Sequence, residues 1–539
     1  MNIAALHPNT PINIDALHTE LLAHPNPAFV HSLISNLRAG CRIGFTGPRD
    51  VSVRSPNLSS AAAHPEVVDQ YLATECSRGH TAGPFNAPPF VHLRTSGVGV
   101  VPKKSGGHRL IMHLSAPDGN SVNSFIDRQA YRFSLITIDT IADHVRRTGL
   151  EALLSKVDLK HAFRLCPVHP DDWPLLGMLW KGNYYFDTVL PFGLRSAPSL
   201  FNCLATALEW ILRNNYSIPA LEHYLDDFVS VSPAAESVAS SAAATHKATI
   251  LQVFAKLGVP TADGPDKVVG PATCLTVLGI DIDSAAGELR LPAEKLRTLR
   301  QLLAAWATWP SASKHELQSL VGHLAFAAKV VPAGRTFTRR LINLCSSVTS
   351  PAAAVRLTSE ALADIKWWQD LLPLWNGKAL LRDPVWSKSP DLELFTDASG
   401  SGFGGFYQGR WFAGTWSAAQ QAPPYTSIMW REMWPIAIAC QLWGPHWAQK
   451  KILLHCDNSA VCTAWESGTC RHAGVMALIC STMQLTARHN FCLLVRHIAG
   501  VDNSIGDALS RAQFQRFRRL VPDAETAPSS LASAQSDNR

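Results

Sequence analysis

Within its 539 residues the sequence has no apolar run that reaches membrane-spanning length without a charge. The nearest candidate, residues 429–443, is interrupted by Arg431 and Glu432. Residues 1–22 do not combine a basic start with an apolar core, so no secretory signal is recognisable. These absences predict a protein that is intracellular, cytoplasmic or nuclear, not secreted, and without a membrane partner.

Paired cysteines and several catalytic signatures are also lacking. The 12 cysteines are scattered, with none of the close paired spacings of a zinc site. Free thiols in a reducing compartment are the simplest interpretation. The sequence has no Asp-Thr-Gly or Asp-Ser-Gly signature of an aspartic protease, no clear recombinase or integrase pattern and no internal repeat.

The composition predicts several domains with substantial hydrophobic cores. Hydrophobic residues make up 47% of the chain, and charged residues only 17%. The net charge is +6, and the isoelectric point is about 8.7. This mild excess of positive charge is compatible with a polyanionic partner but does not identify one.

The segment Tyr224-Leu225-Asp226-Asp227 carries the most information. Two adjacent carboxylates lie in an apolar setting, which is costly unless something compensates their charge. A tight hairpin would bring both acids to one site, and a divalent cation is the natural compensator. The alternative is an ordinary Asp-Asp turn between two strands.

Asp158 is the best candidate for a third carboxylate, because it ends an apolar strand and precedes Ala162-Phe163. Nucleotide polymerisation by two-metal chemistry needs a pair of divalent ions that activate the attacking hydroxyl and neutralise phosphate charge. Three carboxylates suffice as protein ligands when substrate oxygens complete the coordination shell.

With these residues the chain resembles the reverse transcriptases. Three segments match the family's catalytic motifs in order and separation: 157–163 (VDLKHAF), 190–198 (LPFGLRSAP) and 224–227 (YLDD). Several shorter sequence segments are similar to those of the DIRS/Ngaro-type retroelements, which are tyrosine-recombinase retrotransposons. That likeness lies in segments 83–85, 97–104, 119–123 and 327–335, and the whole resemblance covers about residues 80–512.

The resemblance implies roles in nucleotide binding for Lys103, Lys104, Arg109, Phe163, Phe192, Gly193 and Tyr224. Phe163 would be the steric gate that favours deoxynucleotides, although without Asp158 nearby it would be interpreted as a core aromatic. Arg109, with Lys103 or Lys104, would hold the triphosphate; otherwise this basic segment is a solvated turn. Lys267 would protonate pyrophosphate, or else be a solvated surface lysine.

The C-terminal part resembles ribonuclease H. Asp397, Glu432, Asp457 and Asp507 match that family's four carboxylates and would form a second two-metal site, for hydrolysis. His497 matches its mobile histidine; taken alone it would be a structural histidine.

Two residues complicate this second site. Asp502 competes with Asp507, but the pattern Gly-x-Asp-Asn-x-x-x-Asp-x-Leu-Ser-Arg favours Asp507. Pro435, three residues after Glu432, could shift the aim of that carboxylate, because a proline in a helix interior costs about 3 kcal/mol.

The expected fold is multidomain α+β: a right-hand polymerase with fingers, palm and helical thumb, then an α/β ribonuclease H-like domain. Three helices, 292–306, 315–329 and 359–372, are expected in the thumb, with no strand between them. The expected segments are an extension (1–82), fingers and palm (83–288), thumb, connection and linker (289–389), the nuclease domain (390–513) and a disordered basic tail (514–539).

The resemblance implies an RNA-directed DNA polymerase that also degrades the RNA strand of RNA–DNA hybrids. Its cofactors would be two Mg²⁺ ions in each site, with Mn²⁺ as an alternative. Its partners would be an RNA template, a DNA primer, RNA–DNA hybrid, deoxynucleoside triphosphates and other retroelement proteins. Two alternatives remain: a non-catalytic nucleic-acid-binding scaffold, and a ribonuclease H with an inert polymerase half.

Basic residues of the helical region are candidates for phosphate contacts. They are Lys314, Lys329, Arg335, Arg339 and Arg340. For any one of them a solvated helix face is the competing interpretation.

Overall fold

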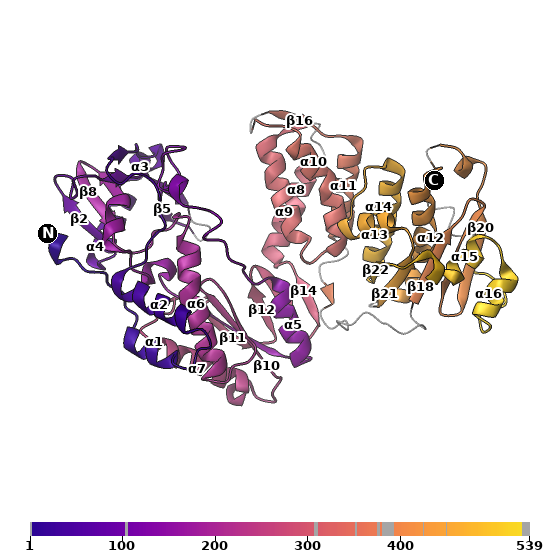
Figure 1. The fold of residues 1–539 in the computed structure, drawn as a ribbon, viewed down its shortest axis with the longest axis horizontal. Helices are drawn as coiled ribbons and strands as arrows, with labels where there is room; N and C mark the ends of the chain where they lie inside the picture. Colours follow the sequence, from indigo (N-terminus) through magenta and orange to yellow (C-terminus); the bar gives the residue numbers. More distant parts are fainter. Residues whose placement is uncertain are drawn as a thin grey trace. The chain divides into compact units, whose positions relative to one another are not determined.

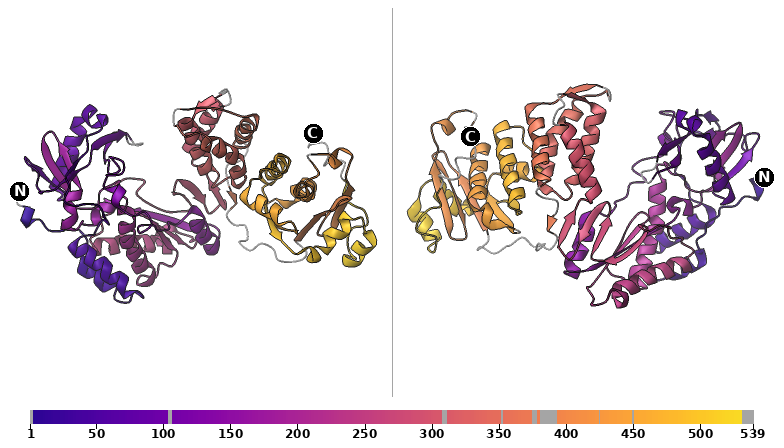
Figure 2. Two further views of the ribbon diagram at one scale, coloured as in Figure 1. Left: turned by 45° about the horizontal axis from the view of Figure 1, so that its top comes forward. Right: turned by 180° about the vertical axis from the view of Figure 1, so that it is seen from behind.

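A computed structural model describes residues 3–102, 106–306, 311–350, 353–373, 378–379, 393–423, 425–448 and 450–530. The chain divides into two compact units, residues 1–277 and 278–539, and each is described by itself. Figure 1 shows the elements of both units, and Figure 2 gives two further views. Within the described residues, no helix combines the length and apolarity that crossing a membrane requires.

The first unit is mixed α and β. Its helices are α1 (Ile14–Glu20), α2 (Pro27–Ala39), α3 (Ser59–Ala63), α4 (Pro65–Ser77), α5 (Ile138–Thr148), α6 (Ala197–Asn214) and α7 (Ala242–Lys256). Its strands are β1 (Val53–Arg54), β2 (Thr81–Phe85), β3 (Arg94–Thr95), β4 (Val98–Pro102), β5 (His108–Met112), β6 (Leu153–Asp158), β7 (Gly177–Trp180), β8 (Asn183–Asp187), β9 (Leu221–Tyr224), β10 (Asp227–Ser232), β11 (Val268–Ala272) and β12 (Cys274–Val277).

Three sheets organise this unit. One has the strand order β1-β3-β7-β8-β2, and the second has the order β11-β6-β10-β9. Strands β4 and β5 form a separate hairpin. The sheet β11-β6-β10-β9 matters most for function, because its two central strands, β6 and β10, carry the acids Asp158 and Asp227 at their ends.

Helix α6 shows how the sequence builds the core of this unit. Pro198 lies in its first turn, where a proline is tolerated because the N–H would be unpaired anyway. Phe201, Leu204, Leu208 and Ile211 follow at spacings of three and four residues, and all are fully buried. The helix therefore packs one continuous apolar face against the rest of the unit.

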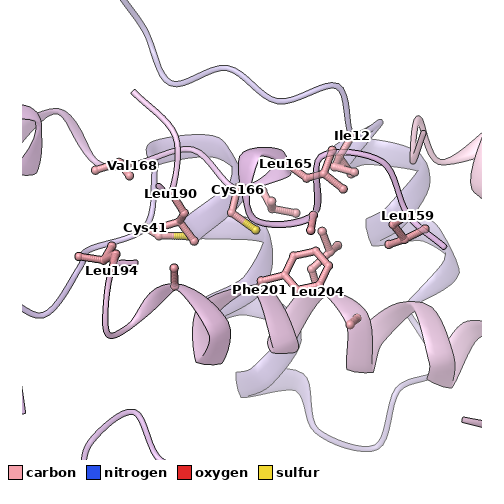
Figure 3. Close-up of a cluster of buried hydrophobic side chains, with 14 of the residues drawn as sticks. Ile12, Cys41, Leu159, Leu165, Cys166, Val168, Leu190, Leu194, Phe201 and Leu204 are labelled. Atoms are coloured by element: carbon pink, nitrogen blue, oxygen red, sulfur yellow. The ribbon is translucent and has the colours of Figure 1, made fainter. Parts of the chain in front are cut away.

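The first eighty residues belong to the same core. In Figure 3, Ile12 and Cys41 from the N-terminal segment lie in one cluster with Leu165, Phe201 and Leu204. The N-terminal segment is also fixed to the end of α7, where the Asn13 amide donates to the Leu257 carbonyl at 2.8 Å. This segment thus braces the sheet that carries Asp158.

The second unit begins with helices and ends with a sheet. Its first elements are β13 (Ile280–Asp283), β14 (Glu288–Arg290), α8 (Ala293–Trp306), β15 (Ser311–Ser313), α9 (Lys314–Ala327), α10 (Thr336–Ser346), β16 (Ala354–Arg356), α11 (Ser359–Leu371) and β17 (Lys378–Ala379). Its later elements are β18 (Glu393–Ala398), β19 (Gly402–Tyr407), β20 (Arg410–Thr415), α12 (Ile428–Trp443), β21 (Lys451–Cys456), α13 (Ser459–Ser467), α14 (Ala473–Arg488), β22 (Cys492–His497), α15 (Ser504–Ser510) and α16 (Phe514–Leu520).

The sheet of the second unit has the order β20-β19-β18-β21-β22. Strands β18, β21 and β22 are parallel, whereas β19 and β20 run antiparallel to their neighbours. Successive strand residues point to opposite faces. Accordingly Phe412 packs in the cluster of α12–α14, while Trp411 packs in the cluster of α15 and α16. The sheet is therefore covered by helices on both faces.

The structure corrects two expectations for this unit. Between the predicted thumb helices lie short strands, β15 and β16, which pair antiparallel, and a further helix, α10. The tail predicted to be disordered contains helix α16, whose Phe517 is fully buried. Residues 531–539 and the linker residues 381–390 lie outside the described residues, and the predicted segment boundaries stay predictions.

Candidate active sites

Asp158 and Asp227 are directly opposite each other across strands β6 and β10. Directly opposed residues of an antiparallel pair project to the same face, so both carboxylates share one side of the sheet. Tyr224 is the partner of Asp227 on the other flank, in β9. The intervening Val157 and Phe228 point to the opposite face and are fully buried. One face is thus core and the other carries the acids.

Asp226 lies in the tight turn that joins β9 to β10. Leu225 has a φ of 54°, a conformation that a non-glycine residue adopts only when its surroundings enforce it. The Asp226 carbonyl accepts a 2.9 Å hydrogen bond from the Leu159 amide, which ties this turn to the end of β6. The hairpin predicted from the sequence is present, and it brings Asp226 beside Asp158.

Two lysines and a shared proton balance the charge of Asp158. Lys267 Nζ donates to its Oδ2 at 2.7 Å, and Lys156 Nζ lies 3.3 Å from its Oδ1. Burial works to raise the pKa of Asp158, but hydrogen bonds from Asp227 and Lys267 overcome it and lower the pKa. Lys267 therefore pairs with Asp158, while its side chain stays 41% exposed to solvent.

In the other two acids of the trio, Asp226 and Asp227, the pKa is raised and not lowered. Burial, together with the neighbouring charge of Asp158, raises the pKa of both Asp226 and Asp227. Three carboxyl groups in this space cannot all ionise without a compensating cation. Asp158 Oδ1 is buried and makes no hydrogen bond. A trio of this kind, in which this buried oxygen has only the ion-pair contact to Lys156, fits a hard divalent cation.

Phe163 lies five residues after Asp158, in the 3₁₀ turn η3 (Ala162–Leu165). Its half-buried ring packs 5.5 Å from the buried ring of Phe201 and 5.3 Å from Phe192, centroid to centroid. Phe192 is itself 48% exposed. Phe163 is thus at once the edge of the core and part of an open surface, so the two interpretations of this residue are compatible.

The loop of Gly193 is fixed by a residue to which the sequence assigned no role. Asn123 Nδ2 donates to the Gly193 carbonyl at 2.9 Å, and its Oδ1 accepts from the Arg195 amide at 2.8 Å. Gly193 has a φ of +92°, and a Cβ there would lie 3.2 Å from the Met112 carbonyl oxygen. Gly193 therefore serves both a left-handed turn and a close approach to β5.

The remaining predicted nucleotide-binding residues are only partly described. Arg109 is exposed on β5, opposite Val101 in the β4–β5 hairpin. Tyr224 is half-buried beside Asp227. Lys103 and Lys104 lie outside the described residues. The roles of all four stay predictions.

In the second unit, four acids come from four elements. Asp397 is in β18, Glu432 in α12 and Asp507 in α15, while Asp457 directly follows β21. Ligand atoms of Glu432, Cys456 and Asp457 all lie within 4.8 Å of one another, a spacing that can hold a metal ion. Cys456 is fully buried and borders this group.

Electrostatics ties Asp397 to the same group. Burial, with the charges of Asp457 and Asp507 adding to it, raises the pKa of Asp397 to about 6. Burial and the charges of Asp397 and Asp457 raise the pKa of Glu432 to about 9. Glu432 Oε2 is buried without a hydrogen-bond partner. This donor set also fits a divalent cation.

Asp507 has a lowered pKa, in contrast to Asp397 and Glu432. Burial favours its neutral form, but hydrogen bonds from Arg511 and Arg516, both at 2.5 Å, outweigh that effect and lower its pKa. Ser510, in the same helix, donates to the carboxylate of Asp397. Asp502 is exposed in a separate turn. The geometry thus favours Asp507 over Asp502.

His497 and Pro435 are both explained by local structure. His497 is exposed at the end of β22, and its Nε2 is 3.2 Å from the Asp457 carbonyl oxygen, so it borders the acids. Helix α12 continues through Pro435. Glu432 remains 5% exposed and adjacent to Asp457, so the proline does not turn this carboxylate away.

Among the basic residues of the thumb, Arg340 is not on a solvated face. It pairs with both carboxylate oxygens of Asp364, a fully buried residue, and its Nη2 lies 3.5 Å from Cys480 Sγ of α14. Arg335 and Arg339 are exposed, so they remain candidates for phosphate contacts.

Comparison with known proteins finds a family model that matches one segment of the chain. Residues 101–282 match the family model described as reverse transcriptase (RNA-dependent DNA polymerase). Those residues include Asp158, the loop of Gly193 and the Asp226–Asp227 hairpin. The chain therefore carries a reverse transcriptase domain of the retroviral and retroelement type.

Individual relatives are more distant. The Gag-Pro-Pol polyprotein of Human T-cell leukemia virus 3 is 27% identical over 233 residues, which are 43% of this chain and 15% of that protein. A foamy viral protease-reverse transcriptase solved with an RNA/DNA hybrid is 16% identical, with a TM-score of 0.49, over 91% of this chain and 64% of that one. The same protein with double-stranded DNA is 15% identical, with a TM-score of 0.48, over 91% and 98%.

Proposed function

We propose that the protein is an RNA-directed DNA polymerase that also degrades the RNA strand of RNA–DNA hybrids. The observation that carries the polymerase half is the pairing of Asp158 with Asp227 beside the Asp226 turn, inside the segment that matches the reverse transcriptase model. The nuclease half is supported by Asp397 and Glu432, whose buried carboxyl groups have raised pKa values, and by Asp457, whose carboxylate lies near that of Glu432.

The cofactors are two Mg²⁺ ions in each site, or Mn²⁺, held by Asp158, Asp226 and Asp227 in one and by Asp397, Glu432, Asp457 and Asp507 in the other. When bound, such ions activate the attacking oxygen and neutralise charge on the phosphate. The chain's own residues then have distinct tasks. Lys267 and Lys156 hold Asp158 ionised, and the Phe163 ring excludes a ribose 2′-hydroxyl.

The substrates are an RNA template, a DNA primer, deoxynucleoside triphosphates and the RNA–DNA hybrid that results. Arg109 would bind the triphosphate and His497 would assist proton transfer or product release. The protein would serve a DIRS/Ngaro-type retroelement, with other retroelement proteins as partners, in the cytoplasm or nucleus. The foamy viral relatives were solved with hybrid and duplex DNA, which supports this choice of partners.

Two single substitutions test the proposal. Asp226→Asn should abolish extension of a DNA primer on an RNA template and leave hybrid cleavage intact. Asp397→Asn should do the reverse. The controls are Asp263→Asn, a residue paired with Lys160 and 83% exposed, and Asp502→Asn in the exposed nuclease turn. Neither control should alter either reaction.

The outcomes separate the alternatives. Primer extension by Asp226→Asn at the wild-type rate would rule out the assignment of Asp226 to a polymerase active site. Hybrid binding with neither activity in the wild type would favour the scaffold, and cleavage without extension would favour the inert polymerase half.

A further inference from the structure

Arg164 forms the centre of a buried ionic cluster that the polymerase chemistry does not use. The side chain is 4% exposed, and so close to complete burial a charge needs partners. Its Nη1 lies 3.0 Å from Asp187 Oδ2, and its Nε lies 3.4 Å from Glu75 Oε2. Its Nη2 donates to the Tyr71 hydroxyl at 2.6 Å.

These partners are themselves fixed. Glu75 accepts from Arg78 Nη1 at 2.9 Å, and His80 Nδ1 lies 2.9 Å from its other oxygen. The Thr81 hydroxyl donates to Asp187 at 2.7 Å. The cluster therefore joins α4, β2 and β8 to the short turn η3. The Arg164 guanidinium is held by two ion pairs and by one hydrogen bond to a phenol, so it cannot shift without losing these contacts.

The turn that the cluster holds is strained. His161 and Ala162 have φ values of 67° and 34°, and neither is a glycine. Conformations of this kind cost about 1–3 kcal/mol each and persist only where surrounding contacts enforce them. The strained pair lies between Asp158 and Phe163. Arg164, the residue after Phe163, supplies the strongest tertiary contacts of the turn.

Phe163 depends on that turn for its position. Its ring is only half-buried, and it packs against the buried Phe201 and against the exposed Phe192. The neighbouring Leu165 is 1% exposed and packs into the core cluster of Figure 3. The backbone of η3 is thus anchored through Arg164 and Leu165, and the half-buried Phe163 ring directly before them packs against the exposed Phe192.

We propose that the cluster of Arg164, Glu75, Asp187 and Tyr71 positions the Phe163 ring and thereby sets the discrimination between deoxyribonucleotides and ribonucleotides. The inference rests on the proposed polymerase function. Arg164 is a positioning residue, because it lies behind the ring in the buried interior. Loosening the anchor would let the strained turn relax and move the ring by a fraction of its own width, which is enough to admit one hydroxyl group.

The experiment measures kcat/KM for one deoxynucleotide and for the matching ribonucleotide, with the full chain on a defined RNA template. Tyr71→Phe removes one hydrogen bond to Arg164 and keeps the ring in the core. Glu75→Gln weakens one of the two ion pairs. Each variant should relax the discrimination about threefold to tenfold, as expected for the loss of one contact with the strength of a typical hydrogen bond. Phe163→Val, measured alongside, should relax it further.

A matched control separates positioning from stability. Arg49→Lys weakens another ion pair of the first unit without touching η3: Arg49, whose side chain is 37% exposed, has its Nη2 2.6 Å from the fully buried Asp172. This control should lower the melting temperature without changing the ratio of the two kcat/KM values.

Each remaining outcome is decisive. If Phe163→Val relaxes the discrimination but Tyr71→Phe and Glu75→Gln leave it unchanged, the cluster has a purely structural role and the inference fails. If Phe163→Val also leaves it unchanged, the gate assignment itself fails, and the inference with it. Absence of primer extension by the wild-type chain, or extension by Asp226→Asn at the wild-type rate, would instead count against the proposed function.

Discussion

Replacing Asn123 with alanine should weaken nucleotide binding without touching an acid of the site. Asn123 is 5% exposed and makes three side-chain hydrogen bonds, to the Gly193 carbonyl, to the Arg195 amide and to the Ser115 hydroxyl, at 2.9, 2.8 and 2.9 Å. Truncation leaves those three groups without this partner. A buried polar group that loses its partner costs about 1–3 kcal/mol.

The expected total is smaller than three such losses. Gly193 is exposed and Arg195 is half-buried, so water can replace part of what is lost at both. We therefore expect a loss of about 2 kcal/mol in the free energy of unfolding, measured by urea denaturation. Because the Gly193 loop carries Phe192 toward Phe163, the KM for the deoxynucleotide should rise about tenfold, with a smaller change in kcat.

Asn57→Ala is the matched control for this prediction. Asn57 also bridges two backbone groups of the first unit, donating to the Leu179 carbonyl at 2.9 Å and accepting from the Val98 amide at 3.0 Å. It does not touch the Gly193 loop, so its loss should affect stability and leave KM unchanged. Equal changes of KM in both variants, or no change in Asn123→Ala, would refute the assignment of Asn123 as the anchor of the loop.

Three further outcomes are expected. Burial opposes the ionisation of Glu75, but His80 and Arg164 lower its pKa from 4.5 to about 2. The ionised carboxylate therefore stabilises the fold fully above pH 4.5, and this stabilisation is lost as the pH falls toward 2. Glu75→Gln should cost about 3 kcal/mol of unfolding free energy at pH 7 and progressively less below pH 4.5, measured by urea unfolding. Arg516→Gln should lower the Mg²⁺ concentration that half-saturates hybrid cleavage, because it frees one oxygen of Asp507, and a higher concentration would contradict this. Phe517→Ala should destabilise the second unit by about 3–5 kcal/mol in thermal unfolding, whereas a disordered tail would show no effect.

The three acids of the first site follow short local patterns, whereas the four acids of the second site were implied only by the resemblance to ribonuclease H. Asp158 ends an apolar strand, and Asp226 and Asp227 lie in a hairpin between two strands, so local sequence contains the information that brings them together.

Other features were out of reach because they depend on partners far apart in the chain. Tyr71 and Asp187 are more than a hundred residues from each other, and nothing near Arg164 indicates that it is buried between them. The three-residue strands β15 and β16 are too short to show a period. Helix α16 was recoverable, since Phe514, Phe517 and Val521 repeat at helical spacing, but its arginines led to the interpretation of a disordered tail.

The two acidic sites differ in where their compensating cations originate, and this difference decides how each can fail. In the first, Lys156 lies on the same strand as Asp158, and Lys267 directly precedes β11, which pairs with that strand, so the balance of charge belongs to the sheet itself. In the second, the cations at Asp507 are Arg511, at the end of α15, and Arg516, on α16. Helix α16 is itself held in place by the buried Phe517 and by the hydrogen bonds that Arg518 donates to the carbonyls of residues 524–526. Any perturbation that releases α16 therefore alters the charge at Asp507, whereas Asp158 keeps its partners for as long as its sheet is folded.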